Sequence, residues 1–168
     1  MPGRSLQITG AAELRRLARD MRGIEHRAEI RKRLARNIRQ PGKEMQMAVR
    51  TAAIAIPSRG ESARRGKMPL GRRFARATSL QVKTSGDSAG VKLWVNPAKM
   101  PDGQRALPAY EEGETGPWRH PLFGQADSSW FTQSPHPFFW PTVNPRLPAF
   151  YRAAEDAIDA AADEIERG

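Results

Sequence analysis

The residues of this chain best suited to acid–base or metal chemistry are two adjacent carboxylates and two histidines. Glu111 and Glu112 are consecutive, and His120 and His136 follow them, each beside a proline. Consecutive side chains of a strand point to opposite faces, so a strand here would separate the two carboxylates. The histidines are 16 residues apart, and the chain has neither cysteine nor an HExxH motif to complete a zinc site. We therefore expect hydrogen-bonded structural histidines, no catalytic residue, no metal and no cofactor.

The residues best suited to binding phosphate lie between positions 59 and 76. This stretch holds seven Lys or Arg and one acid, Glu61. The densest residues are Arg64, Arg65, Lys67, Arg72 and Arg73. A basic arm can follow phosphates without reading a sequence, so these five are candidates for contact with DNA. The alternative is a solvated loop that becomes ordered only in an assembly.

An aromatic segment, defined here as residues 118–140, holds three of the four Trp, four of the six Phe and two of the three His. Its prolines, and Pro117 just before it, prevent most of it from being helical, so we predict loops and short strands. The segment is either a cover of the core or a surface for a partner. We expect mostly core and subunit–subunit packing, with Trp118 and Phe138 as representative residues.

Apolar residues at helical spacing predict helices over 11–21, 24–40 and 43–56. Pro41-Gly42 separates the last two as a kink or a break, and Pro57 ends the third. Five Gly or Pro positions predict a loop over 57–71. A short strand is predicted over 5–8.

Alternating residues predict a β-hairpin with strands over 78–84 and 91–95, joined by a turn at 85–87. A Pro/Gly loop follows over 97–109. Asn144-Pro145 begins a final helix with an apolar stripe made of Leu147, Phe150, Ala154, Ile158, Ala161 and Ile165. The fold class is therefore α+β, with N-terminal helices and a C-terminal helix packed on a small antiparallel β-sheet, and with long Pro/Gly-rich loops.

The length of 168 residues fits one domain over 1–168. Its parts are basic helices (1–56), a basic loop (57–76), the hairpin with the aromatic segment (77–143) and an acidic helix (144–168). The longest apolar run, Ala52–Ile56, is too short to span a membrane. No signal peptide is apparent, so we expect a soluble protein without a membrane partner, intracellular where it is made.

The charge of the chain is +10 and is unevenly distributed. Residues 1–76 carry 20 basic and 6 acidic residues (+14), and residues 77–168 carry 8 and 12 (−4). Such asymmetry suggests contact with nucleic acid or an acidic protein surface, and it also allows head-to-tail self-association. The candidates for contacts between copies are Glu155, Asp159 and Asp163 in the final helix and Arg27 and Arg31 in the basic helices.

The order of these parts resembles the neck, tail-completion and minor-tail proteins of long-tailed bacteriophages. The resemblance covers roughly residues 25–165. It rests on the helix ending at Pro57, on Leu70-Gly71 with Phe74 and Ser79 at the hairpin entry, on Tyr110–Gly113, on Arg119–Gly124 followed by Trp130 and Gln133, and on Pro137–Phe139 with Pro141. The Arg-His-Pro-Leu-Phe-Gly stretch is the most specific of these.

This resemblance implies a structural α+β subunit of a virion, located in the neck or at the top of the tail and assembled in the host cytoplasm. It implies a homo-oligomeric ring, with six copies favoured, which contacts other neck or tail-tube proteins. Genomic DNA would pass through its lumen and be held without sequence specificity. A closed ring is built from heterologous contacts, which suits a chain with one acidic and one basic surface.

Two other classes of function compete with this interpretation. A stand-alone nucleic-acid-binding module would use the basic helices and the 59–76 stretch, but no zinc finger, RNP pattern or helix-turn-helix is evident. A small hydrolase would use His120 or His136 with Glu111 or Glu112, but no GxSxG, P-loop or dinucleotide fingerprint supports it. We therefore predict a structural protein that is not an enzyme.

Overall fold

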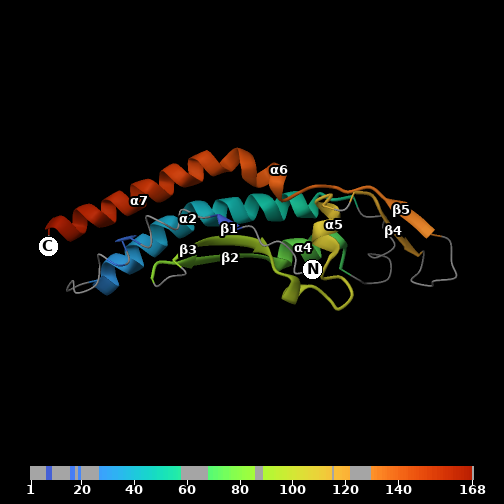
Figure 1. Cartoon of the computed structure of the whole chain (residues 1–168), viewed down its shortest axis with the longest axis horizontal. Helices are drawn as coiled ribbons and strands as arrows, with labels where there is room; N and C mark the ends of the chain where they lie inside the picture. The colour runs from blue at the N-terminus through green and yellow to red at the C-terminus, as the bar shows by residue number, and fades with distance from the viewer. Residues whose placement is uncertain are drawn as a thin grey trace.

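A 28-residue helix, α2 (Arg27–Ile54), is the element against which α7, α4 and β2 pack. The computed structural model describes residues 7–8, 16–17, 19, 27–57, 68–85, 89–114, 116–121 and 130–167. Figure 1 shows an elongated α+β molecule in which α2 lies between α7 and a small sheet. The remaining elements are β1 (Gln7–Ile8), α4 (Leu70–Ala77), β2 (Thr78–Lys83), β3 (Gly90–Val95), η1 (Pro97–Lys99), α5 (Leu107–Glu111), β4 (Trp118–Pro121), β5 (Trp130–Gln133), α6 (Trp140–Val143), η3 (Asn144–Arg146) and α7 (Leu147–Arg167).

Helix α2 continues without interruption through Pro41, so the break considered at Pro41-Gly42 is wrong. Proline has no N–H to donate to the carbonyl four residues earlier, which weakens a helix at that point. The buried positions nevertheless keep their spacing on both sides of it, from Ile38 to Met45. Packing of this continuous apolar face holds the helix together. The earlier helix predicted over 11–21 is seen at Arg16, Leu17 and Arg19, and its other residues lie outside the described part.

Helix α4 corrects the predicted loop over 57–71 and the basic arm that was drawn through residue 76. Residues 70–77 are helical, and residues 58–67 lie outside the described part. The reason is tertiary packing: a Cβ added to Gly71 would lie 2.1 Å from the carbonyl oxygen of Ala53, so the absence of a side chain lets α4 approach α2. Phe74 of α4 is fully buried beneath this contact.

The antiparallel sheet has the order β1-β3-β2 and confirms the predicted hairpin and the short N-terminal strand. Leu80 pairs with Leu93 and Val82 with Val91, as the alternation of apolar residues requires. Helix α2 covers this sheet closely, because a Cβ on Gly42 would lie 3.2 Å from the Leu80 side chain. The side chains of Gln46 and Arg50 both donate to the carbonyl oxygen of Thr78, which joins helix and sheet.

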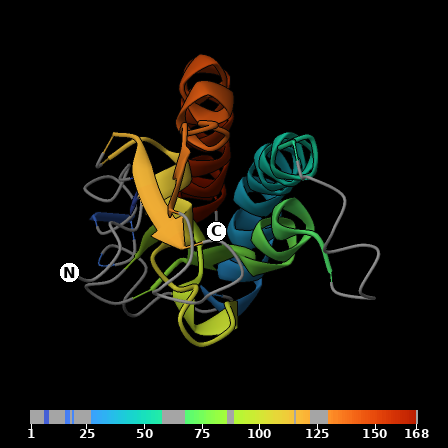
Figure 2. The same cartoon turned by 90° about the vertical axis from the view of Figure 1, so that its right-hand side faces the viewer.

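The C-terminal helix runs antiparallel to α2 and packs along it (Figure 1). Helical turns begin at Trp140, earlier than the predicted Asn144-Pro145. Phe150, Ala157 and Ala161 are buried, and the rest of the predicted stripe is partly buried against the core. Viewed from the end, α7 and α2 stand side by side (Figure 2). No helix in the described ranges is long and apolar enough to cross a membrane.

Candidate functional site: the carboxylate clamp and the aromatic arm

Glu111 and Glu112 stand at the C-terminal end of α5, which corrects the strand that we had assumed for them. Pro108 occupies the first turn of this short helix, where its missing N–H has no intrahelical partner to lose. Gly113 follows with a φ of +80°, a conformation that favours glycine and ends the helix. Both side chains therefore face the chain segment between Gln133 and Trp140.

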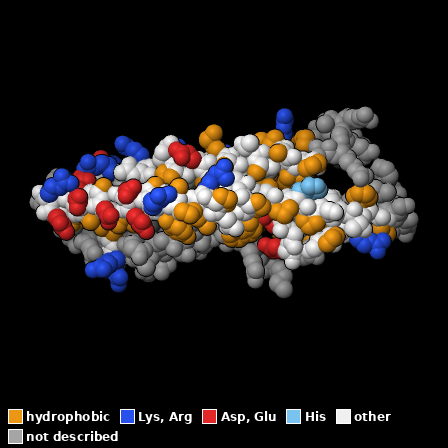
Figure 3. Space-filling model, turned by 90° about the horizontal axis from the view of Figure 1, so that it is seen from above, with side chains coloured by type: hydrophobic (Ala, Val, Ile, Leu, Met, Phe, Trp, Pro, Cys, Tyr) orange, Lys and Arg blue, Asp and Glu red, His pale blue; other side chains and the backbone are white. Residues whose placement is uncertain are grey.

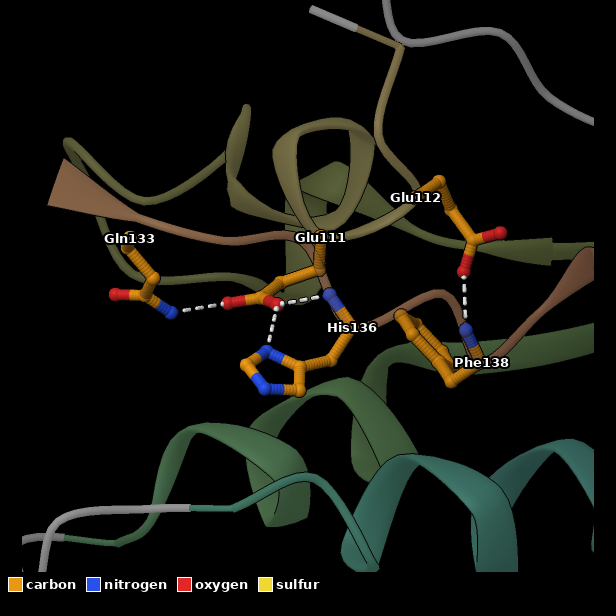
Figure 4. Close-up of polar contacts among 5 residues, drawn as sticks. All are labelled: Glu111, Glu112, Gln133, His136 and Phe138. Atoms are coloured by element: carbon orange, nitrogen blue, oxygen red, sulfur yellow. Dashed lines mark hydrogen bonds and ion pairs between the residues drawn. The ribbon is translucent and has the colours of Figure 1, made fainter. Parts of the chain in front are cut away.

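The carboxylate of Glu111 is completely buried and is satisfied by donors from this segment. Its Oε1 accepts from Nε2 of Gln133 at 2.7 Å, and its Oε2 accepts from the backbone N–H of His136 at 3.1 Å. The Nδ1 atom of the His136 ring lies 3.4 Å from the same Oε2. Figure 4 shows these groups converging on one carboxylate. Burying a carboxylate is unfavourable without such partners.

The carboxylate of Glu112 binds the start of α6. Its Oε1 accepts from the backbone N–H groups of Phe138 at 2.8 Å and Phe139 at 2.7 Å, and its Oε2 accepts from that of Trp140 at 3.2 Å. These N–H groups precede or open a helical turn and have no intrahelical acceptor. Glu111 and Glu112 together fasten residues 133–140 to α5, and we refer to the pair as the carboxylate clamp (Figure 4).

The strands β4 and β5 form an antiparallel pair that we call the aromatic arm. Trp118 pairs with Gln133 and Pro121 with Trp130, so the clamp residue Gln133 is at the base of the arm. At this base the ring of Trp118 stacks on Tyr110 of α5, with centroids 5.5 Å apart. In Figure 1 the arm extends beyond the end of α2 at which α5 and α6 lie. Trp130, toward its outer end, is 51% exposed and has the Arg119 guanidinium 5.8 Å from its ring.

The histidine and carboxylate together have one feature of an acid–base site. The side chain of His136 is 41% exposed and lies beside the fully buried carboxylate of Glu111. A general base and the group that orients it have this arrangement. In the described residues, however, no hydroxyl contacts the imidazole, and no group of three His, Asp or Glu could hold a metal. The side chain of His120 lies outside the description. The recorded contacts of the clamp thus hold the arm in place.

The predicted DNA-contact residues do not share one environment. Arg64, Arg65 and Lys67 lie outside the described residues. Arg72 is exposed on α4, whereas Arg73 is partly buried and donates from Nη1 to Oε1 of Gln104 at 2.6 Å. Arg73 therefore has an internal partner and a helical backbone, unlike a residue of a basic loop.

The candidates for contacts between copies also differ in their exposure. Glu155, Asp159 and Asp163 are exposed on α7. Arg31 is partly buried with its Nε inaccessible, and the Arg27 side chain lies outside the description. Trp118 is half-buried at the base of the arm.

Phe138 confirms the core part of the prediction for the aromatic segment, because it is 3% exposed and stacks on Phe74 within the same chain at 5.3 Å, which leaves little of its ring for a subunit contact. The sequence reasoning also missed the partners of the clamp. Gln133 and the N–H groups of His136 and of residues 138–140 are more than 20 positions away from it, and periodicity cannot reveal such contacts. No family model, curated protein or solved structure matches this chain.

Proposed function

We propose that this chain is a structural subunit of a phage head–tail joining or tail-terminating ring, through which DNA passes. The observation that carries the proposal is the aromatic arm, which is attached at its base by the Trp118–Tyr110 stack and the Gln133–Glu111 hydrogen bond and extends beyond the helices. The resemblance of residues 25–165 to neck and tail-completion proteins supplies the location in a virion. The α+β architecture is compatible with that resemblance.

The arm has the properties of a docking element for a second copy. An isolated two-stranded sheet is marginally stable in water, and each of its strands has an outer edge that no described strand pairs with. Trp130 exposes half of its surface there, although large aromatic side chains are enriched at protein interfaces. Docking on a neighbour would bury this ring and extend the sheet. A contact between an arm and a different surface is heterologous, so repeated copies can close into a ring.

Light scattering measures the mass of the assembly directly. We expect a mass near six copies, or another small closed number, at low salt. Trp130→Ser is expected to reduce this mass at equal concentration, while Ala98→Ser serves as a control because Ala98 is exposed in η1, outside the arm and outside α2 and α7. Equal masses for both variants would remove the arm from the interface. A monomer at every salt and protein concentration would contradict the ring.

A stand-alone nucleic-acid-binding module is the second candidate, and exposed basic residues on α2 and α4 favour it. Arg72 and Arg76 are both exposed, one helical turn apart on α4. Such a module would stay monomeric and bind duplex DNA with a strong dependence on salt. Fluorescence anisotropy with a labelled duplex, comparing the chain with its Arg72→Ala/Arg76→Ala variant, separates it from a ring subunit that only tolerates DNA in its lumen.

A further inference from the structure

The outer face of α2 carries a basic stripe, which we define as Lys32, Arg36, Arg39 and Lys43. Their spacing of four, three and four residues places them on one side of the helix, and all four are exposed. Lys32 has an exposed ion pair with Glu29 of the same helix at 3.9 Å, which contributes little. No ion pair is recorded for the other three within the described part of the molecule.

The outer face of α7 carries an acidic stripe, which we define as Glu155, Asp159, Asp163 and Glu166. The spacing is four, four and three residues, and all four side chains are exposed. Figure 3 shows the acidic side chains gathered along the part of the surface where α7 lies. The recorded ion pair between α2 and α7 uses neither stripe, because it joins Arg33 to Glu164.

The two stripes match in length and in the charges that border them. The first and last members of each stripe are 11 positions apart, which is roughly 16 Å along a helix at 1.5 Å per residue. Acids border the basic stripe, with Glu29 three residues before it and Glu44 one residue after it. Basic residues border the acidic stripe at the same distances, Arg152 before it and Arg167 after it. Counted from the N-terminal end of each helix, the two patterns therefore agree in length and borders with the signs inverted. They differ by one position at the third residue of the stripe, which is seven positions after the first in α2 and eight in α7.

We infer that copies of this chain associate through these surfaces, the acidic stripe of α7 on one copy against the basic stripe of α2 on the next. The inference rests on the self-association in the proposed function, but not on the virion location. The two surfaces cannot pair within one copy, because α7 already packs along α2 through other faces. Each copy thus keeps one unused surface of each sign, which allows a ring or a filament.

DNA is a weaker explanation of the same residues. A duplex would account for the basic stripe alone, and it would be repelled by the acidic stripe of the adjacent helix. The acids that border the basic stripe would also repel phosphate. In a pair of copies, the basic residues that border the acidic stripe give these acids partners. A second copy accounts for both stripes and both borders.

Charge reversal in each stripe tests this pairing. The α7 variant is Asp159→Lys with Asp163→Lys, and the α2 variant is Arg36→Glu with Arg39→Glu. Each variant alone presents like charges across the contact, so we expect its self-association to weaken at least about tenfold at low salt. A 1:1 mixture has opposite charges at every contact between unlike variants. We therefore expect the mixture to recover the mass of the unmodified assembly in light scattering.

The control changes charge by the same amount outside the stripes. Asp102→Lys with Glu114→Lys alters two exposed acids, and we expect the mass to stay unchanged. Circular dichroism melting establishes that each variant is folded. An assembly that ignores both reversals, or a mixture that stays dissociated, overturns the stripe pairing but leaves the arm and the ring in place. Loss of DNA binding by the α2 variant at unchanged mass would assign the basic stripe to DNA instead. A monomeric unmodified chain at every salt and concentration would contradict both the pairing and the ring.

Discussion

A carboxylate removed from water must find donors for its oxygens, and Glu111 finds them in the segment that carries the arm. The amide of Gln133 and the backbone N–H of His136 both bind it, while Glu112 takes the next three N–H groups of the chain. Two neighbouring residues thus bind five others within residues 133–140. In the proposed assembly, this attachment would set the angle at which the arm leaves the body.

Replacement of one oxygen tests the clamp at the residue scale. In Glu111→Gln an amide nitrogen takes the place of one acceptor, so a buried donor loses its partner. We expect the free energy of unfolding to fall by about 1–3 kcal/mol. Urea denaturation measures the change, with Glu114→Gln as a control within about 0.5 kcal/mol because Glu114 is exposed. Equal stability of the two variants would show that Glu111 is not needed to hold the segment.

The two helical glycines of α4 and α2 provide a matched pair of variants. A Cβ on Gly71 would collide with the backbone carbonyl of Ala53 at 2.1 Å, whereas a Cβ on Gly42 would meet only the Leu80 side chain at 3.2 Å. Gly71→Ala should therefore destabilise the protein by about 1–3 kcal/mol. Gly42→Ala should stay within about 1 kcal/mol, because alanine favours the helix and Leu80 can move. The midpoint of thermal unfolding ranks the two, and the reverse order would refute the packing argument.

At the scale of elements, the aromatic segment is divided between the core and the arm. Phe138 stacks on Phe74 beneath α4, while Trp130 is exposed at the outer part of the arm. Composition could not separate these roles, because every aromatic side chain of the segment has the same local signature. The difference comes from where the clamp holds the chain, which depends on contacts between distant residues.

Truncation of aromatic side chains should follow this division. Phe138→Ala removes a ring that is 3% exposed and should cost about 3–5 kcal/mol of unfolding free energy. Trp118→Ala should cost less, because its ring is half-buried and stacks on Tyr110 at the edge of the body. Guanidinium denaturation followed by circular dichroism compares the two. A near-neutral Phe138 variant would mean that the Phe74–Phe138 stack contributes little to the fold.

Local periodicity predicted the elements whose contacts are periodic. The two hairpin strands and the apolar stripe of α7 follow from alternation and from three- and four-residue spacing, and both are confirmed. Helix α4 was missed because Gly71 reads as a loop residue until Ala53 is seen beside it. Helix α5 was missed because the sequence around Pro108 also suits a turn. To predict an uninterrupted α2, one would have to know that its apolar face is covered along its whole length.

At the scale of the whole molecule, charge is organised by helix. Helix α2 carries eight basic and two acidic residues, for a net charge of +6, and α7 carries two and six, for a net charge of −4. The total of +10 conceals this arrangement, which becomes visible once the two helices are seen side by side. The sequence predicted separated charges, but which residues point outward depended on how α7 packs on α2.

The dependence of assembly on salt follows from these exposed charges. Between 0.05 M and 0.5 M salt the Debye length shortens from more than 10 Å to a few Å, so contacts between the stripes weaken. We expect the mass of the assembly to fall over this range. Sedimentation velocity at several salt concentrations provides the measurement. A mass that rises with salt would instead indicate an interface dominated by apolar contacts such as the arm.

The antiparallel packing of α7 on α2 also has a consequence for synthesis on the ribosome. Residue 167 is added 113 positions after residue 54, so at about 5–20 residues per second the finished α2 precedes the finished α7 by roughly 6–23 s. Strand β1 likewise has no pairing partner until β3, more than 80 positions later, has been synthesised. During that interval the nascent chain exposes apolar surface that the finished protein hides. Slow translation of the second half of the chain would lengthen this exposure.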